Sequence, residues 1–338
     1  MADYSIEKGF TIQSLASDPY TSEGAAGTWA SGGDINQTRN FGGGLGIQTA
    51  GMFVGGSGGG STGNETETYD GTSWTAKNPI NTIRNRMGVA TQSPITASLI
   101  FGGSQPNTAP GYKNETETFD GTSWTTVPAT LNTSRREFGG SAGASNSAAL
   151  GFSGYTTTYI TNVEEYDGST WAEESDVNTA RGVGGGGGTS ADALFVAGLN
   201  PSFSAATETW DGTSWTSSNN ANNARSYFGS GVTSSTSGLI FGGDAGPVPS
   251  AIDDKTESWN GTSWTELADM ANQREGCKGC GTSSLALAFG GYSPGQVTVS
   301  EEWTIPSTVS VAQEGQVWYN TTSTVLKGFG QQGTGAWA

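Results

Sequence analysis

Short apolar segments alternate with polar turns along most of the chain, and none shows the spacing of a helical face. In one clear stretch, residues 97–101 (Ala-Ser-Leu-Ile-Phe) end at a pair of glycines, and residues 115–119 then alternate Glu and Thr before an aromatic residue. An Asp-Gly turn follows and leads to Trp124. With a further segment after an arginine, the pattern predicts a unit of four short strands.

This unit occurs six times. An Arg follows each repeated Trp by ten or eleven residues, and a Glu precedes the next Trp by seven, except in the last copy. From Arg39 to Arg274 the mean period is 47 residues. The shared positions are Trp29, Trp74, Trp124, Trp171, Trp215 and Trp264; Arg39, Arg84, Arg135, Arg181, Arg225 and Arg274; and Glu67, Glu117, Glu164, Glu208, Glu257 and Glu301.

Four strands per unit and a period near 47 residues are typical of β-propeller blades around a common axis. The order Arg, apolar strand closing on Gly-Gly, Glu-x-Tyr-Asp and then Trp resembles the kelch repeat and covers residues 29 to about 305. The turn departs from that family, because Asp-Gly-Thr-Ser stands where kelch repeats often have Asp-Pro. The resemblance implies an all-β fold, a six-bladed kelch-like β-propeller.

The sixth unit ends near Ile305 without a Trp strand, while Trp29 stands alone before the first Arg. We therefore predict that residues 29–34 complete the last blade and remove an open sheet edge. Trp337 lies in a similar local sequence and is the alternative closing residue. Trp29 is favoured because it already lies ten residues before Arg39.

Two segments flank the propeller. Residues 1–28 carry no repeat signal, and we interpret them as an N-terminal extension for docking or oligomer contact. In the C-terminal extension, 306–338, the segments 315–320 and 324–329 predict a short β-hairpin. This hairpin, Trp-Tyr-Asn followed by Leu-Lys-x-Phe, resembles segments of bacteriophage tail and fibre virion proteins.

The amino-acid composition excludes several classes of function. The net charge of −17 disfavours nucleic-acid binding, because phosphates would be repelled. The absence of His excludes His-based catalysis and His-ligated metals, so we expect no metal and no cofactor. The two cysteines, Cys277 and Cys280, give no disulfide framework and are predicted to be buried thiols. No segment predicts secretion or membrane insertion, so synthesis in the host cytoplasm is expected.

The six repeated arginines allow two interpretations. They could line one mouth of the axial channel and bind an anion. Alternatively, each Arg pairs with the repeated Glu of its own unit as part of the fold. The second interpretation is favoured, because both residues occur once in every unit.

The loops between the second and third strands differ in length and content, and divergent loops on a repetitive scaffold often carry recognition. Exposed aromatic residues there suit stacking on sugar rings or contact with protein. The alternative is that these solvent-exposed loops differ in sequence without any role in binding. The candidate ligand-binding residues are Tyr112, Lys113, Tyr155, Tyr159, Phe203, Asp244, Asp253, Asp254 and Tyr292.

These observations predict a non-enzymatic structural protein of a phage virion, associated with a tail or fibre, whose propeller binds a host surface glycan or protein. Its expected partners are other virion proteins, through residues 1–28 and 306–338, in an oligomeric arrangement. One alternative is a capsid or neck decoration or connector protein with a purely structural propeller. Another is a glycan-degrading enzyme that uses loop carboxylates such as Asp244, Asp253 or Asp254.

Overall fold

The computed structural model describes residues 13–15, 27–58, 63–106, 108, 111–246, 251–305, 317–320 and 324–328. These residues form β-strands, turns and loops and contain no α-helix. Within these ranges there is accordingly no helix with the length and apolarity to cross a membrane. The chain divides into two compact units, one of Thr28–Thr304 and one that combines Met1–Gly27 with Ile305–Ala338.

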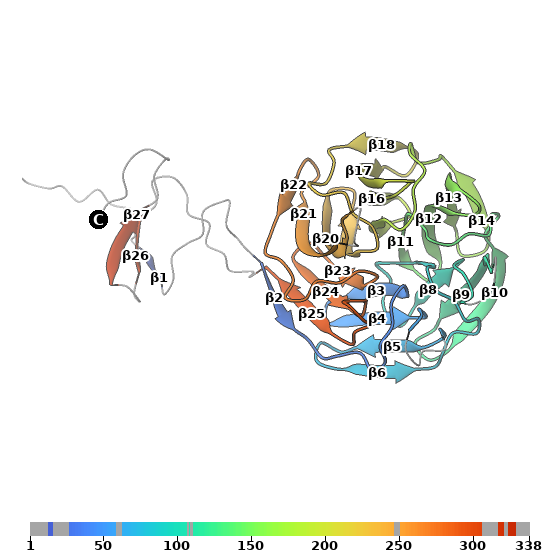
Figure 1. Ribbon diagram of the computed structural model, residues 1–338, viewed down its shortest axis with the longest axis horizontal. Coiled ribbons are helices and arrows are strands. Elements are labelled where there is room, and N and C mark those ends of the chain that lie inside the picture. Colours follow the sequence, from blue (N-terminus) through green and yellow to red (C-terminus); the bar gives the residue numbers. More distant parts are fainter. Residues whose placement is uncertain are drawn as a thin grey trace, which may run out of the picture. The chain divides into compact units, whose positions relative to one another are not determined.

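The unit Thr28–Thr304 is a six-bladed β-propeller, which confirms the expected fold (Figure 1). Each blade is a four-stranded antiparallel sheet, with its first strand near the axis and its last strand at the rim. The blades are blade 1, β3 (Gly43–Ile47), β4 (Ala50–Val54), β5 (Thr66–Tyr69) and β6 (Trp74–Lys77); blade 2, β7 (Gly88–Val89), β8 (Ser98–Phe101), β9 (Glu115–Phe119) and β10 (Trp124–Thr130); blade 3, β11 (Gly140–Ser145), β12 (Ala148–Tyr155), β13 (Tyr159–Tyr166) and β14 (Trp171–Glu174); blade 4, β15 (Gly185–Thr189), β16 (Asp192–Leu199), β17 (Phe203–Trp210) and β18 (Trp215–Ser218); blade 5, β19 (Gly229–Ser234), β20 (Ser237–Asp244), β21 (Ile252–Trp259) and β22 (Trp264–Glu266); and blade 6, β23 (Lys278–Gly281), β24 (Leu285–Phe289), β25 (Ser300–Thr304) and β2 (Thr28–Ser31).

The N-terminal strand β2 completes blade 6, as the sequence predicts. It pairs antiparallel with β25, and Trp29 lies opposite Trp303 in the register. The Trp29 ring also packs edge-on against Phe241 of blade 5, with 4.9 Å between ring centroids. The alternative closing residue, Trp337, lies outside the described residues.

The hydrophobic core lies between neighbouring blades. Met52 and Val54 of blade 1, for example, pack in one cluster with Ile100 and Phe119 of blade 2. The repeated Trp side chains sit at these boundaries and, in five of six cases, donate an indole Nε1 hydrogen bond of 2.9–3.0 Å to a hydroxyl of the preceding blade. Each acceptor directly precedes the repeated Glu; the pairs are Trp29–Thr256, Trp74–Ser300, Trp124–Thr66, Trp171–Thr116 and Trp264–Thr207.

A closed ring of backbone hydrogen bonds surrounds the axis at the entry to the inner strands. The residue two positions after each repeated Arg donates its N–H to the carbonyl of the corresponding residue in the preceding blade, over 2.6–3.2 Å. These residues have φ between 51° and 63°, which is uncommon for residues other than Gly. The ring runs through Phe41, Arg86, Glu137, Val183, Tyr227 and Gly276 and returns to Phe41.

The second unit contains a three-stranded sheet. Strands β26 (Val317–Asn320) and β27 (Val325–Gly328) form the hairpin predicted from the sequence. Strand β1 (Gln13–Leu15) pairs with β26 in parallel, so the N-terminal segment adds a strand that the sequence pattern does not indicate.

Candidate functional site

The repeated arginines are part of the fold and do not line the channel. Each forms an ion pair with the Glu of its own blade, and both side chains are at least 97% buried. The Arg84 guanidinium lies 2.6 Å from the Glu117 carboxylate, which also accepts the backbone N–H of Asn81. Burial lowers the pKa of Arg84, and the charge of Glu117 opposes that shift. These six guanidinium groups are therefore already bound and have no access to a ligand.

The chain has eight arginines, and the two outside the repeat, Arg86 and Arg136, lie on neighbouring blades. Both approach the carboxylate of Glu137, with Arg86 Nη1 at 3.5 Å and Arg136 Nε at 3.6 Å from Glu137 Oε1. The Nε atoms of both arginines form no hydrogen bond among the described residues. Their side chains are 26% and 30% exposed, so two cations share one carboxylate within reach of solvent.

Three of the predicted tyrosines lie near Arg136, two in contact with its guanidinium group and the third packed against one of those two. Its guanidinium carbon lies 5.5 Å from the ring centroids of both Tyr112 and Tyr155, a cation–π distance. Tyr155 also packs edge-on against Tyr159, with centroids 5.2 Å apart. Burial and the nearby charge of Glu137 raise the pKa of Tyr159. We call Tyr112, Tyr155 and Tyr159 the tyrosine cluster.

A cavity of about 420 Å³ is joined to this cluster by Arg136, which lines the cavity and contacts Tyr112 and Tyr155. Arg86 and Arg136 both line it, with Ser57, Asn85, Ser104, Gln105, Pro106 and Thr108, and no carboxylate does so among the described residues. The Asn85 Oδ1 atom accepts a 2.7 Å hydrogen bond from Ser104 Oγ, which leaves the Asn85 Nδ2 group to donate elsewhere. We call this space the two-arginine cavity. It is a cationic, donor-rich cavity on a strongly acidic chain.

Of the remaining candidate residues, one adjoins the tyrosine cluster in sequence and the others lie on blades 4, 5 and 6. Lys113, next to Tyr112, is 3.8 Å from Glu115, and Phe203 begins β17 of blade 4. Asp244, Asp253 and Asp254 belong to blade 5, where burial and the charges of Asp269 and Asp253 raise the pKa of Asp254. Tyr292 is exposed and bridges Glu275 of blade 6. No ring contact or hydrogen bond in the described part of the chain joins the residues of blades 4, 5 and 6 to the tyrosine cluster.

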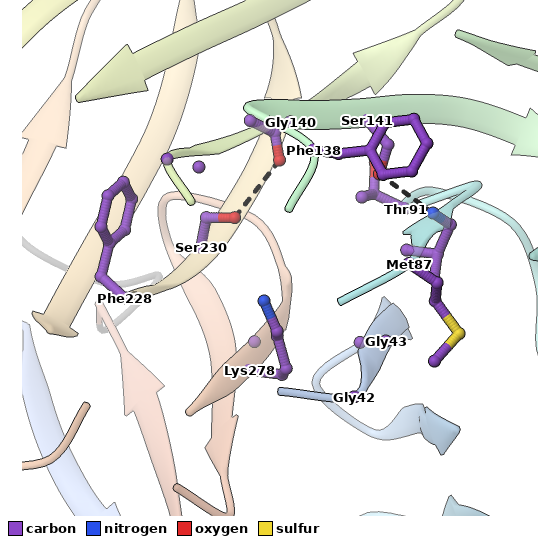
Figure 2. Close-up of a pocket in the computed structure, with 16 residues that line it drawn as sticks. Gly42, Gly43, Met87, Thr91, Phe138, Gly140, Ser141, Phe228, Ser230 and Lys278 are labelled. Atoms are coloured by element: carbon purple, nitrogen blue, oxygen red, sulfur yellow. Dashed lines mark hydrogen bonds between the residues drawn. The ribbon is translucent and has the colours of Figure 1, made fainter. Parts of the chain in front are cut away.

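The axial channel forms a second space of about 70 Å³, lined largely by glycines of the inner strands (Figure 2). Figure 2 shows Lys278 pointing into this space. Burial lowers the pKa of Lys278, and the positive charge of Arg86 acts in the same direction. Its amine has no ion-pair partner within the described ranges. The corresponding residue is a glycine in every other blade: Gly43, Gly88, Gly139, Gly185 and Gly229.

Both cysteines are buried and unpaired, as predicted. No group of three or more Cys, Asp and Glu side chains in the described ranges could hold a metal ion. No protein-family model matches the chain, and no curated protein matches it. The geometry of its own residues therefore carries the functional argument.

Sequence reasoning missed Arg86, Arg136, Glu137 and Asn85. One signal was available, since two arginines remained after the repeat had accounted for six. Their convergence on one carboxylate depends on how blade 2 packs against blade 3, which no local sequence pattern indicates.

Proposed function

We propose that this chain is a non-enzymatic structural component of a phage particle, associated with a tail or fibre, and that its propeller binds a glycan on the host surface. The tyrosine cluster carries this proposal. Two aromatic rings from divergent loops contact one guanidinium group that lines a polar cavity, and the third ring packs against one of them. Aromatic faces next to polar donors are a common way to hold a sugar ring, which has apolar faces and a polar edge.

Rigidity favours recognition at this site. Tyr155 ends β12 and Tyr159 begins β13, so the tight connection between two long strands holds both rings. Arg136 is fixed through its backbone, because its N–H and C=O both pair with Tyr155. Groups held in place before binding lose little conformational entropy when a ligand arrives.

The assignment to a particle rests on resemblance. The repeat resembles kelch repeats, and the hairpin within 315–329 resembles segments of phage tail and fibre proteins. The unit that contains β1, β26 and β27 combines both ends of the chain and is our candidate for contact with other virion proteins. Mass spectrometry of density-gradient-purified particles tests this. A fixed copy number relative to the major capsid protein is expected, and recovery only in the soluble fraction would contradict it.

Binding to host cells tests the role of the tyrosine cluster. The triple variant Tyr112→Ala, Tyr155→Ala and Tyr159→Ala should bind host cells and their purified surface glycans at least tenfold more weakly than the parent. Tyr292→Ala is the matched control. Tyr292 occupies the repeat position of Tyr155 in blade 6 and has no aromatic or guanidinium partner among the described residues. Melting temperatures close to that of the parent would show that both variants fold.

Other results of these two experiments would favour different functions. Unchanged binding of the triple variant would place recognition elsewhere. Particle incorporation without any host binding would favour a decoration or connector protein. Shortening of the glycan by the purified chain would favour the enzyme.

A further inference from the structure

We infer that the two-arginine cavity binds the anionic group of an acidic saccharide, a carboxylate or a sulfate ester with one negative charge. This inference rests on the proposed function and names the class of glycan. It uses Arg86 and Arg136, which the repeat does not need.

The distribution of charge supports an anion. Thirty-one acidic residues outnumber fourteen basic ones in this chain, and six of its eight arginines are buried in ion pairs of the fold. The other two, Arg86 and Arg136, both line the same cavity. In the described part of the chain, the carboxylate of Glu137 is the one ion-pair partner of both, which leaves one net positive charge. A singly charged anion would neutralise this excess.

The contacts of Glu137 leave donors for a ligand. Its distances of 3.5 Å and 3.6 Å to the two guanidinium groups are longer than the roughly 2.7–2.9 Å of a charge-assisted hydrogen bond. Glu137 therefore orients both side chains without using all their N–H groups. Arg presents several N–H donors in a planar fork that matches a carboxylate or sulfate.

Both guanidinium groups are held in place by packing. The Arg86 guanidinium carbon lies 4.7 Å from the Phe41 ring centroid, and the Arg86 backbone N–H belongs to the closed ring around the axis. The Arg136 guanidinium carbon lies 5.5 Å from the ring centroids of both Tyr112 and Tyr155, and these two rings pack against each other with centroids 6.3 Å apart. The two cations are thus fixed before a ligand arrives, which lowers the entropic cost of binding.

The neighbouring groups favour a saccharide over an isolated anion. Asn85 Nδ2 and the side chain of Gln105 offer hydrogen bonds to hydroxyl groups. Tyr112 and Tyr155 offer aromatic rings next to Arg136, which lines the same cavity. An acidic sugar unit presents all three features, namely an anion, hydroxyl groups and an apolar ring face. The cavity and cluster together fit one or two such units better than phosphate or an acidic peptide.

Paired polysaccharides test this inference. Binding of the full chain is measured at 150 mM salt to a uronate polysaccharide and to the same polymer after reduction of its carboxyl groups. A sulfated and a neutral polysaccharide form the other pair. We expect the parent to bind at least one acidic polymer at least tenfold more tightly than its uncharged counterpart. The polymer that binds identifies the anion as carboxylate or sulfate.

Charge-removing variants connect that preference to the cavity. Arg86→Gln and Arg136→Gln should each weaken binding to the acidic polymer by about 10- to 100-fold, with little effect on the uncharged one. Arg136→Lys keeps the charge and loses the planar fork, so its affinity for the acidic polymer should lie between those of the parent and of Arg136→Gln. Lys77→Gln is the control, because it removes one positive charge from the exposed outer strand of blade 1.

The outcomes separate the two proposals. Equal binding to acidic and uncharged polymers, unaffected by the arginine variants, would overturn this inference and leave glycan binding standing. Binding to host cells that protease treatment abolishes would identify a protein ligand and overturn both. No binding to any glycan or cell would also overturn both. An acidic-polymer preference that Lys77→Gln weakens as much as Arg136→Gln would indicate general charge attraction and contradict the cavity.

Discussion

The Trp215 side chain packs in one cluster with Val163, and its indole Nε1 has no hydrogen-bond acceptor among the described residues. Its five repeat counterparts donate to a Thr or Ser at the position of Val163. Blades 3 and 4 therefore lack one hydrogen bond that every other blade boundary has. A buried donor without a partner costs about 1–3 kcal/mol.

Val163→Thr should repair that boundary. The new hydroxyl would accept from Trp215 Nε1, as Thr207 does from Trp264, and raise the free energy of unfolding by about 1 kcal/mol. The melting temperature should rise by about 2–4 °C. The reverse change, Thr207→Val, should lower both quantities by similar amounts. A Val163→Thr variant less stable than the parent in urea denaturation would contradict this account.

The buried ion pairs should respond strongly to loss of one partner. Arg84→Met leaves the Glu117 carboxylate buried without its cation and should cost about 3–5 kcal/mol of folding free energy. Adding Glu117→Gln removes that charge and keeps an amide oxygen for the Asn81 N–H, so part of the loss should return. Guanidinium denaturation measures both variants. A cost below about 1 kcal/mol for Arg84→Met would mean that the pair is dispensable for the fold.

The hairpin turns predict a dependence of stability on pH. Hydrogen bonds from Ser73 and Thr72 lower the pKa of Asp70 to about 2, and the same turn lowers those of Asp167 and Asp211 to about 2. A carboxyl whose pKa is lower in the folded state stabilises the protein above its unfolded pKa near 4. That contribution is lost as the pH falls from about 4 to 2.

Blade 5 provides a control for this effect. Asn260 makes the same backbone contacts in its turn and does not titrate. Replacing Asp70, Asp167 and Asp211 by Asn should therefore flatten the fall in urea midpoint between pH 4 and pH 2. An unchanged slope would show that other groups control acid unfolding.

Closure of blade 6 can be tested by two truncations. Removing residues 1–27 keeps β2, so the propeller should still melt cooperatively as a monomer. Removing residues 1–34 deletes β2 and Trp29, exposes β25 as an edge and should prevent monomeric folding. Calorimetry with light scattering compares the two. Melting of the longer truncation like the parent would contradict closure by β2.

Lys278 should destabilise the fold at neutral pH. Burial and Arg86 both disfavour its charged form and lower its pKa, so protonation opposes folding until the pH approaches the unfolded pKa near 10.4. Lys278→Met removes that charge and should raise the free energy of unfolding at pH 7 by about 1 kcal/mol. The gain should shrink as the pH rises toward 10. Lower stability of the variant would show that the amine makes a favourable contact in the channel.

The repeat made much of this fold predictable from sequence. Regular spacing of Trp, Arg and Glu identified six blades, and the isolated Trp29 identified the closing strand. The role of the repeated arginines remained open, because equal copy number fits both a ring of ligands and a set of ion pairs. Arg86 and Arg136 were missed because only the packing of blades 2 and 3 brings them together.

The ring of backbone hydrogen bonds could not be predicted from the sequence, for a different reason. Its members carry unlike side chains, so no residue type marks the position. The independence of this ring from side-chain identity has a consequence for evolution. Only main-chain atoms form the hydrogen bonds of this ring. The side chains of Phe41, Arg86, Glu137, Val183 and Tyr227 can therefore change without loss of these bonds, provided that the new residue tolerates a positive φ. Selection can thus alter the chemistry of the mouth one residue at a time while the architecture beneath it persists.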